Sequence, residues 1–312
     1  MIRAPYRALT ALLAIVAVLL VSGCGRSAVG GEAGNSSSDP PVLVFAAMPS
    51  FLFHTEQRFQ EPVIEMLEKE TGEEVRFQTG TDYAAIIKGL RDRKIDVALL
   101  GPLSYVLAKE QGAPITLVAV RVNEKGKPTG YQSYGITWAG SSIKTLADFR
   151  GKKICFVDRD STSGYLYPSA GLLALGINPD KDITPIFVGR HDASVLAVAH
   201  HQCDAGFAYD TVVDRQLIDE GQLQPGEVTT VWKSGTVPGP PLVIANYLST
   251  KLRQQLTTAL QNKANADYLR ANGFCQGKCA VADGDSYGYQ SANDADYQSL
   301  SEICRKVHNN LC

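Results

Sequence analysis

Three hydroxyl residues and a glycine, Ser161-Thr162-Ser163-Gly164, form the segment of this chain whose chemistry best suits an anion. At the start of a helix, the first backbone N–H groups lack intrahelical partners and the helix dipole favours negative charge. Hydroxyl and N–H groups placed there can hold a phosphate-like group without a formal cation. Serine is also a common helix N-cap, so the motif alone is more typical of a cap than of a binding site.

The residues on either side of this motif predict a strand before it and a helix after it. Residues 153–157 (KICFV) have strand character, and the charged residues 158–160 (DRD) end that run. From residue 166 to 175, apolar side chains recur at helical spacing up to Gly176. The hydroxyl residues are therefore expected at a strand-to-helix turn, where the helix start presents them.

Elsewhere, strand-like apolar runs alternate with helix-like segments, which is typical of an α/β protein with mainly parallel strands. We expect strands at residues 42–46, 74–78, 95–100, 134–138, 183–187, 205–208 and 242–247, and helices at 56–71, 82–94, 143–149, 191–200 and 250–262. Gly101 followed by Pro102 favours a further helix start. The turns at 81–83 and 101–104 should then face one edge of a sheet, where ligands collect in open α/β folds.

The order of these elements predicts two lobes. A chain of 312 residues is long enough for two substantial cores. The first lobe is expected to comprise residues 42–130 together with 236–312, and the second residues 131–235. Because the chain leaves the first lobe and later returns to it, two strands must cross between the lobes and act as hinges.

The N-terminal residues predict export and lipid anchoring. Arg3 and Arg7 precede an apolar run at 8–21, which ends in the sequence Val-Ser-Gly before Cys24. The run is shorter than the roughly 20 residues needed to span a bilayer, so a bacterial lipoprotein signal at 1–23 is favoured over a transmembrane anchor. Cys24 would be the lipidated first residue on the extracytoplasmic face of the cell membrane. The Gly-, Ser- and Pro-rich residues 24–41 would form a flexible tether.

Six further cysteines fit the same oxidising compartment. They are Cys155, Cys203, Cys275, Cys279, Cys304 and Cys312. Six cysteines allow 15 pairings, and we favour a bridge that joins two strand ends, Cys155 to Cys203, with local bridges among the four C-terminal cysteines. A zinc site at 275–279 is the alternative, which the lack of neighbouring histidines disfavours.

The composition excludes some classes of partner. With 30 basic and 32 acidic residues, the chain carries no basic surplus that could neutralise a nucleic-acid backbone. No residue pattern calls for a cofactor or a metal ion. We therefore expect neither nucleic-acid binding nor cofactor chemistry. We also expect the protein to be a monomer.

Several motifs in a fixed order resemble the phosphate/phosphite/phosphonate-binding proteins of bacterial ABC importers. The motifs are DYAAIIKGLR at 82–91, DVA at 96–98 with Gly101, STSGYLYP at 161–168, GRHDA at 189–193 and DA at 204–205. The resemblance runs from about residue 42 to 256, so the C-terminal cysteine-rich part lies outside it. It implies a two-lobed periplasmic-binding-protein fold of type II, with the ligand in the cleft between the lobes.

The resemblance also implies which side chains bind the ligand. Matching positions are Tyr83 in the DYAAII motif, Tyr131 after a glycine at the lobe crossing, the hydroxyl residues Ser161, Thr162 and Ser163, and His191 at a helix start. Each has an ordinary alternative, because tyrosines in α/β proteins often pack half-buried and a first-turn histidine is often solvated. Arg190 could be the cation in place of His191. We interpret His200 and His201 as helix-terminal residues, and His54 as a weak candidate for the cleft border.

The sequence departs from the family pattern where aminoalkylphosphonate binders place two carboxylates around the ligand ammonium. One of these positions is occupied by Pro240 and the other aligns with Thr211. An ammonium buried without a carboxylate would lose its hydration uncompensated. The implied ligand is therefore phosphate, phosphite or methylphosphonate. Asp210, next to Thr211, could accept a hydrogen bond from a protonated ligand oxygen, or could be a surface residue.

The expected function is a lipid-anchored binding protein that delivers a small phosphorus oxyanion to an ABC permease and its ATPase, and not an enzyme. One alternative is a lipoprotein that presents its ligand to a membrane sensor. A second is an exported hydrolase with Ser161 or Ser163 as nucleophile and His191 as base. The motif at 161–164 lacks the G-x-S-x-G pattern that exposes a nucleophilic serine, which disfavours the hydrolase.

Overall fold

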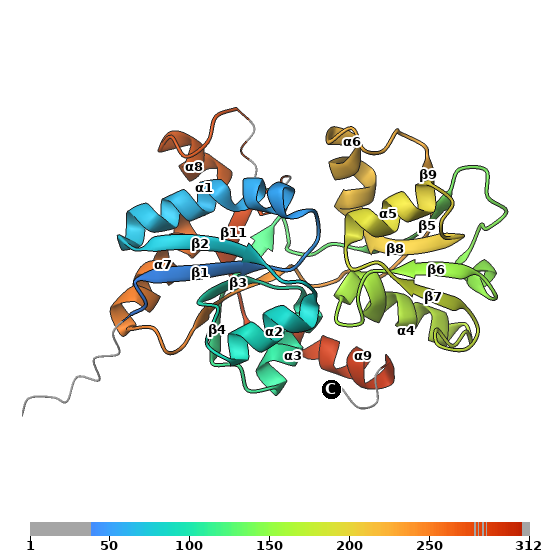
Figure 1. Cartoon of the computed structure of the whole chain (residues 1–312), viewed down its shortest axis with the longest axis horizontal. Coiled ribbons are helices and arrows are strands. Elements are labelled where there is room, and N and C mark those ends of the chain that lie inside the picture. Colours follow the sequence, from blue (N-terminus) through green and yellow to red (C-terminus); the bar gives the residue numbers. More distant parts are fainter. Residues whose placement is uncertain (1–38, 278, 280, 283, 285, 308–312) are drawn as a thin grey trace, which may run out of the picture. The chain divides into compact units, whose positions relative to one another are not determined.

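Apolar strands alternate with amphipathic helices along this chain, and the strands form two mixed sheets (Figure 1). The computed structural model describes residues 39–277, 279, 281, 282, 284 and 286–307. The α/β class expected from the sequence is therefore confirmed. The signal, the lipidation site at Cys24 and most of the expected tether lie outside the described residues.

The first sheet has six strands in the order β11-β4-β10-β3-β1-β2. Its strands are β1 (Val42–Ala47), β2 (Glu74–Thr79), β3 (Val97–Leu99), β4 (Ile115–Val122), β10 (Pro241–Ala245) and β11 (Gly288–Ser291). The three N-terminal strands are parallel to one another, whereas β10 is antiparallel to both β3 and β4. Because β10 enters the sheet after the chain has returned from the second sheet, it runs in the opposite direction. The sheet is mixed, and our expectation of mainly parallel strands was wrong here.

Helices cover both faces of the first sheet because its strands are apolar on both sides. They are α1 (Phe53–Thr71), α2 (Tyr83–Arg91), α3 (Pro102–Glu110), α7 (Thr250–Asn262) and α8 (Ala266–Ala271). Leu43 and Phe45 of β1 pack with side chains of α1 and α7, while Ala46, the next residue, packs with those of α2 and α3. This alternation is what a strand buried on both faces requires.

The second sheet has five strands in the order β7-β6-β8-β5-β9. Its strands are β5 (Ser133–Trp138), β6 (Lys153–Phe156), β7 (Thr184–Phe187), β8 (Ala205–Tyr209) and β9 (Val228–Lys233). Its α-helices are α4 (Tyr167–Ala174), α5 (His191–Ala199) and α6 (Leu217–Asp219), and π-helical turns at Thr162–Leu166 and Val212–Gln216 precede α4 and α6. Figure 1 shows α4 on one face of this sheet and α5 on the other. The helix expected at 143–149 is only a short 3-10 turn at Leu146–Phe149.

Two segments carry the chain between the sheets, and they pair with each other. Tyr131, on the way to β5, forms an antiparallel bridge with Val237, on the way back to β10. Their backbones exchange two hydrogen bonds, of 3.1 and 2.8 Å. Gly130 has φ +135°, and a Cβ there would lie 2.7 Å from the Thr236 side chain. A glycine is needed at this point because the two segments approach so closely.

The C-terminal helix α9 (Gln298–Val307) contacts elements of both sheets. It lies against α3, which packs on the first sheet, and against α4, which packs on the second. Its buried Leu300 joins a cluster that also contains Leu103 of α3 and Leu166 at the end of the π-helical turn. The helix therefore adds a packed link between the sheets that the sequence analysis did not anticipate.

Two disulfide bonds lie within the described residues. Cys155 of β6 is joined to Cys203, just before β8, and Cys275 is joined to Cys279. Cys304 is buried on α9, and Cys312 lies outside the described residues. Among the described helices, none is at once long enough and apolar enough to span a bilayer.

Candidate functional site

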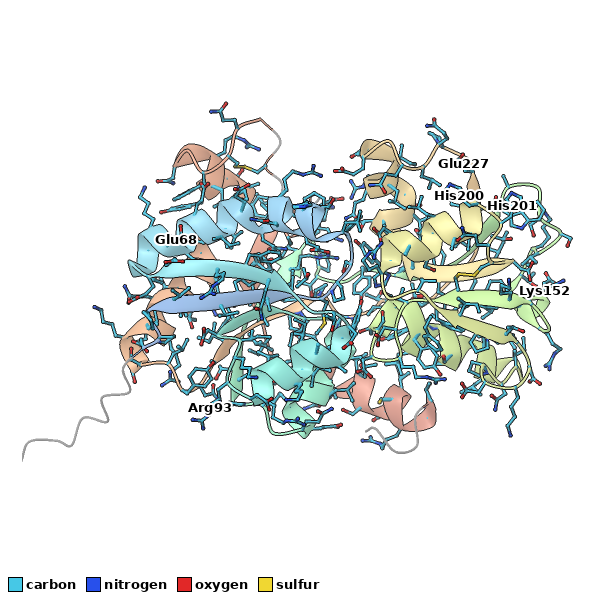
Figure 2. The ribbon with its side chains drawn as sticks, viewed as in Figure 1. Glu68, Arg93, Lys152, His200, His201 and Glu227 are labelled. Atoms are coloured by element: carbon cyan, nitrogen blue, oxygen red, sulfur yellow. A yellow bond between two sulfur atoms is a disulfide. The ribbon has the colours of Figure 1, made fainter. Side chains whose placement is uncertain are left out.

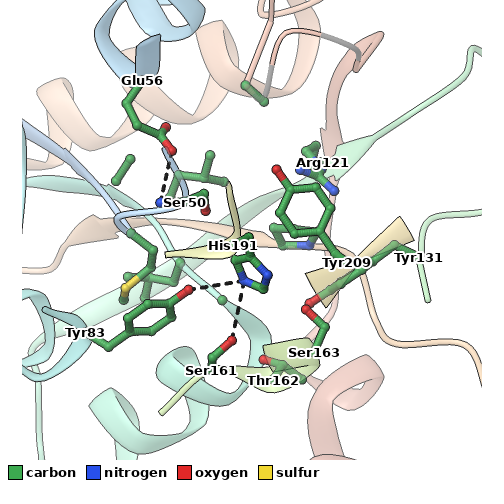
Figure 3. A pocket seen from close by; sticks show the side chains of 17 residues that line it. Ser50, Glu56, Tyr83, Arg121, Tyr131, Ser161, Thr162, Ser163, His191 and Tyr209 are labelled. Atoms are coloured by element: carbon green, nitrogen blue, oxygen red, sulfur yellow. Dashed lines mark hydrogen bonds between the residues drawn. The ribbon is translucent and has the colours of Figure 1, made fainter. Parts of the chain in front are cut away.

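A small cavity of about 60 Å³ lies where the two sheets face each other, and residues from both sheets line it (Figure 3). Its polar lining consists of Ser50, Glu56, Tyr83, Arg121, Tyr131, Ser161, Thr162, Ser163, His191 and Tyr209. Six of the seven side chains proposed as ligand-binding from the sequence are thus in this lining, and Asp210 is the exception. The crossing segments position the cavity, because Tyr131 is part of one of them.

The hydroxyl motif follows the end of β6, as expected, and its three side chains are all buried. Ser161 is the N-cap of the π-helical turn, and its Oγ accepts a hydrogen bond from Gly164 N–H at 3.0 Å. A Cβ at position 164 would lie 2.4 Å from Val157, so only glycine fits at this position. Ser161 therefore both caps this turn and lines the cavity.

Thr162, in the turn after β6 of the second sheet, is hydrogen-bonded to α3, which packs on the first sheet. Helix α3 begins after Gly101, which has no side chain to cap it. The Thr162 Oγ1 accepts the N–H of Leu103 in the first turn of α3 at 2.9 Å. Beside it, Ser104 Oγ donates to the carbonyl of Asp160 at 3.1 Å. Thr162 therefore supplies a helix cap that exists only when these two edges are in contact.

Tyr83 and Tyr131 reach the cavity from opposite sides as neutral hydrogen-bond donors. Tyr83 begins α2, whose N-cap Asp82 accepts Ala85 N–H at 2.7 Å, so the start of the helix fixes its position. Burial raises the pKa of Tyr83 well above its usual range, and burial raises the pKa of Tyr131 to about 12. Both phenols stay protonated at physiological pH and can each donate one hydrogen bond.

His191 stands at the first position of α5 and faces the hydroxyl motif (Figure 3). Its Nε2 lies 3.4 Å from the Tyr83 hydroxyl and 3.5 Å from the Ser161 Oγ. Its Nδ1 is buried and has no hydrogen-bond partner among the described residues. Burial, and then the charge of Arg121, lowers the pKa of His191 to about 3. The ring is therefore neutral at physiological pH and offers one donor and one acceptor nitrogen.

Some residues singled out from the sequence do not line the cavity. Both carboxylate oxygens of Asp210 accept backbone N–H groups, from Gln132 and Thr211, each at 2.8 Å. These bonds link the entry to β5 with the end of β8, and Asp210 does not line the cavity. His54 is exposed and Arg190 pairs with Asp192 at 3.0 Å.

His200 and His201 follow α5 on the side of the second sheet away from the crossing segments (Figure 2). His201 stacks on the ring of Trp138, with 4.5 Å between the ring centroids. Neither histidine lines the cavity.

The sequence analysis missed Glu56, Arg121 and Tyr209. Arg121 lies on β4, a strand that we did not expect, and its guanidinium stands 5.9 Å from the centre of the Tyr131 ring. Tyr209 packs edge-to-face on His191, with 4.7 Å between the ring centroids. Glu56 lies in the first turn of α1, where an acidic residue is so common that its presence gave no signal.

The described residues contain no group of three or more His, Cys, Asp or Glu side chains that could hold a metal ion. The polar groups that line the cavity are instead mainly hydroxyl groups, together with one neutral imidazole, one guanidinium and the Glu56 carboxylate. The hydroxyl, imidazole and guanidinium groups suit a small oxyanion, because their donors can replace the hydrogen bonds of its hydration shell. The arrangement is one for binding a solute.

Two mixed α/β sheets, two crossing segments and a small polar cavity between them define a solute-binding protein with the type II periplasmic-binding-protein fold. The chain belongs to the family described as "ABC transporter, phosphonate, periplasmic substrate-binding protein", whose match covers residues 45–297. Helix α9 lies just beyond that match.

Individual relatives agree with this assignment. The chain is 38% identical to the "Phosphate-import protein PhnD" of Mycolicibacterium smegmatis, over 100% of this chain and 99% of the relative. A solved binding protein component of an ABC phosphonate transporter from Pseudomonas aeruginosa superimposes with a TM-score of 0.74 at 26% identity, covering 85% of this chain and 86% of that one. PhnD1 from Prochlorococcus marinus, solved in complex with methylphosphonate, gives a TM-score of 0.72 at 21% identity over 86% and 99% of the two chains.

The protein is therefore the extracytoplasmic substrate-binding component of an ABC importer of the phosphonate and phosphate class. Its relatives are transport proteins and not enzymes. The family resemblance deduced from the sequence motifs is confirmed.

The neutral state of His191 should appear in the pH dependence of folding. An exposed histidine in the unfolded chain titrates near pH 6.5, whereas folded His191 has a pKa of about 3. Between these values the unfolded chain binds this proton and the folded chain does not. The contribution of His191 to stability is thus fully present above about pH 6.5 and is lost as the pH falls toward 3.

We expect urea unfolding of ligand-free protein to show a larger loss of stability between pH 7 and pH 4 in the wild type than in His191→Asn. All other titrating groups are shared by the two proteins, so the difference reports position 191. Parallel stability curves for the two proteins would contradict the buried neutral imidazole.

Proposed function

We propose that this protein is a lipid-anchored, monomeric binding protein that captures one small phosphorus oxyanion and delivers it to an ABC permease. Phosphate is the first candidate, and phosphite and methylphosphonate are the others. The observation that carries the proposal is the cavity between the sheets, which is lined by buried donors from both of them.

The donors in the cavity lining match the needs of a tetrahedral oxyanion. Tyr83 comes from the first sheet's helices, Ser161 and His191 come from the second sheet's, and Tyr131 comes from a crossing segment. A tetrahedral anion presents its oxygens in several directions at once. Donors converging from four elements therefore bind it better than donors on one surface. The charge of Arg121 favours the anion over a neutral solute.

The size of the cavity favours a small ligand. The cavity is small, with a volume of about 60 Å³, and we propose that it takes a phosphorus atom with four small substituents. Pro240 lines the cavity and Thr211 does not, so neither position gives a carboxylate for an ammonium group.

The printed names of the relatives support the same ligand class. The Mycolicibacterium smegmatis relative is named as a phosphate-import protein and matches the whole chain. A Prochlorococcus marinus relative, 27% identical over 58% of this chain, is named as a probable phosphite-binding protein. Phosphate is our first candidate because the full-length relative carries that name.

Ligand capture is proposed to favour a closed form of two lobes, with residues 42–130 and 236–312 in one and 131–235 in the other. The hydrogen bonds from Leu103 N–H to Thr162 Oγ1 and from Ser104 Oγ to the Asp160 carbonyl join groups of opposite lobes. A ligand that contacts both lobes stabilises the closed form by its extra contacts there. The permease would then recognise the closed form.

The geometry favours binding over hydrolysis. A serine nucleophile needs a histidine base that a third group orients. Here His191 Nδ1 has no hydrogen-bond partner among the described residues, and the pKa of the ring is about 3. Ser161 Oγ is also committed to Gly164 N–H. These features support a solute site rather than a catalytic serine.

Calorimetry of purified protein with phosphate, phosphite, methylphosphonate, aminoethylphosphonate and sulfate tests the proposed ligand class. We expect binding of at least one of the three small phosphorus oxyanions and little or none of aminoethylphosphonate, whose buried ammonium would be uncompensated. If none of the three gives heat or a shift in melting temperature, the proposed ligand class is wrong. Tight binding of aminoethylphosphonate would contradict only the argument from Pro240 and cavity size.

Lipid anchoring at Cys24 makes a separate prediction. In a bacterial host with lipoprotein processing, the wild type should fractionate with membranes and begin at a lipid-modified residue 24. Cys24→Ser should be released from membranes, while Ser36→Ala, in the proposed tether, should behave as the wild type. Intact mass and membrane fractionation measure both. An unmodified wild-type N-terminus that still includes residues 1–23 would refute the anchor.

A further inference from the structure

The C-terminal segment that contains α9 is anchored at its beginning to the first lobe. Tyr297, just before α9, is 3% exposed and packs edge-to-face on Tyr105 of α3, with 5.1 Å between the ring centroids. Its hydroxyl donates to the carbonyl of Gly239, on the returning crossing segment, at 2.9 Å. Beside these rings, the Asp294 carboxylate accepts from Lys109 Nζ at 2.9 Å. The start of the segment is therefore held by α3 and by a crossing segment.

The apolar face of α9 then passes from the first lobe to the second. Leu300 is fully buried and shares a cluster with Leu103 of α3 and with Leu166, the last residue of the turn that carries the hydroxyl motif. Val307, at the end of the helix, also packs against a second cluster, whose buried members all belong to the second lobe. Figure 1 shows α9 next to both α3 and α4, which it contacts. One helix face is thus covered by both lobes.

Opening of the lobes must break part of this packing. The hydrogen bond from Leu103 N–H to Thr162 Oγ1 crosses the boundary between the lobes beside the same cluster. When the turn at 162–166 moves away from α3, α9 cannot stay in contact with both of them. Because the start of the segment is anchored to the first lobe, α9 should remain on α3 and leave α4. Its apolar side chains would then meet water, which disfavours the open form.

We propose that residues 294–307 form a clasp, in which α9 stays on the first lobe and docks its far end on the second lobe only when the lobes close. The clasp stabilises the closed form and so raises the affinity for the ligand. It does so without contacting the ligand, because none of these fourteen described residues lines the cavity. This inference rests on the proposed function, since it concerns closure around the captured oxyanion.

Substitutions on the docked face of α9 test the clasp by calorimetry. The test ligand is phosphate, replaced by phosphite or methylphosphonate if the wild type binds one of those more tightly. Leu300→Ala removes buried contacts with both lobes, so we expect it to bind the ligand at least about fivefold more weakly. Val307→Asn places an amide against apolar side chains of the second lobe and should weaken binding at least about threefold. Because Val307 is only half-buried, this variant provides the test if Leu300→Ala does not fold.

Gln298→Asn is the matched control for these substitutions. Gln298 is an exposed residue of the same helix, and its replacement changes no charge. We expect this variant to keep the wild-type affinity. Melting temperatures of all the variants, measured without ligand, show at which temperature each is folded and can be compared.

Hydrogen exchange measures docking of α9 without any substitution. We expect the ligand to slow exchange of the backbone amides near the end of α9 in the wild type, because docking on the second lobe protects them. Helix α8, which packs on α1 of the first lobe, is the internal control and should exchange at the same rate with and without ligand.

An unchanged affinity in either folded variant would overturn the clasp, even if that variant melted at a lower temperature. Exchange in α9 that does not respond to the ligand would also overturn it. Both results would leave phosphorus oxyanion binding intact. Failure of the wild type to bind phosphate, phosphite or methylphosphonate would instead refute the proposed function itself.

Discussion

Burial of an anion away from water is the physical constraint on which the proposed site depends. An anion removed from water loses a large hydration energy unless other groups replace its hydrogen bonds. No single strand or helix can surround a tetrahedral ion, so the donors must come from several elements. In this protein they come from the starts of α2 and α5, from the turn after β6 and from a crossing segment.

Two sheets joined by paired crossing segments meet this constraint because they can bring separate edges together. The bridge between Tyr131 and Val237 holds the two segments side by side, and Gly130 permits their close approach. Thr162 then caps α3 from the opposite sheet. The same motif that lines the cavity therefore also makes a contact between the two sides, and we propose that this contact couples ligand capture to closure. Helix α9, which packs on α3 and α4, adds apolar contact across the same junction.

Much of this fold could be predicted from local patterns in the sequence. Apolar periodicity predicted β1, α1 and α7 to within a few residues, because the buried residues of each element recur at regular spacing within one short stretch of sequence. The pattern did not reveal β4, nor that β10 would run antiparallel between β3 and β4. Strand neighbours are chosen by contacts far apart in the sequence, and no local pattern specifies them.

The candidate site, like the fold, could be predicted only in part from the sequence. The family resemblance implied that the hydroxyl motif, Tyr83 and His191 share one site, and all of them line the cavity. The sequence analysis missed Arg121 because it did not predict β4, the strand on which Arg121 lies. Glu56 lines the cavity and Asp210 does not, and both oxygens of Asp210 accept backbone N–H groups. Which of two acidic residues faces a cavity depends on tertiary packing, which adjacency to a motif does not determine.

A crystal structure of the protein grown with phosphate tests the central claim most directly. The account predicts one phosphorus atom in the cavity, with its oxygens within hydrogen-bond distance of Tyr83 from one side and of Ser161 and His191 from the other. A phosphate bound elsewhere, or held by groups of one sheet alone in a protein saturated with it, would contradict the account.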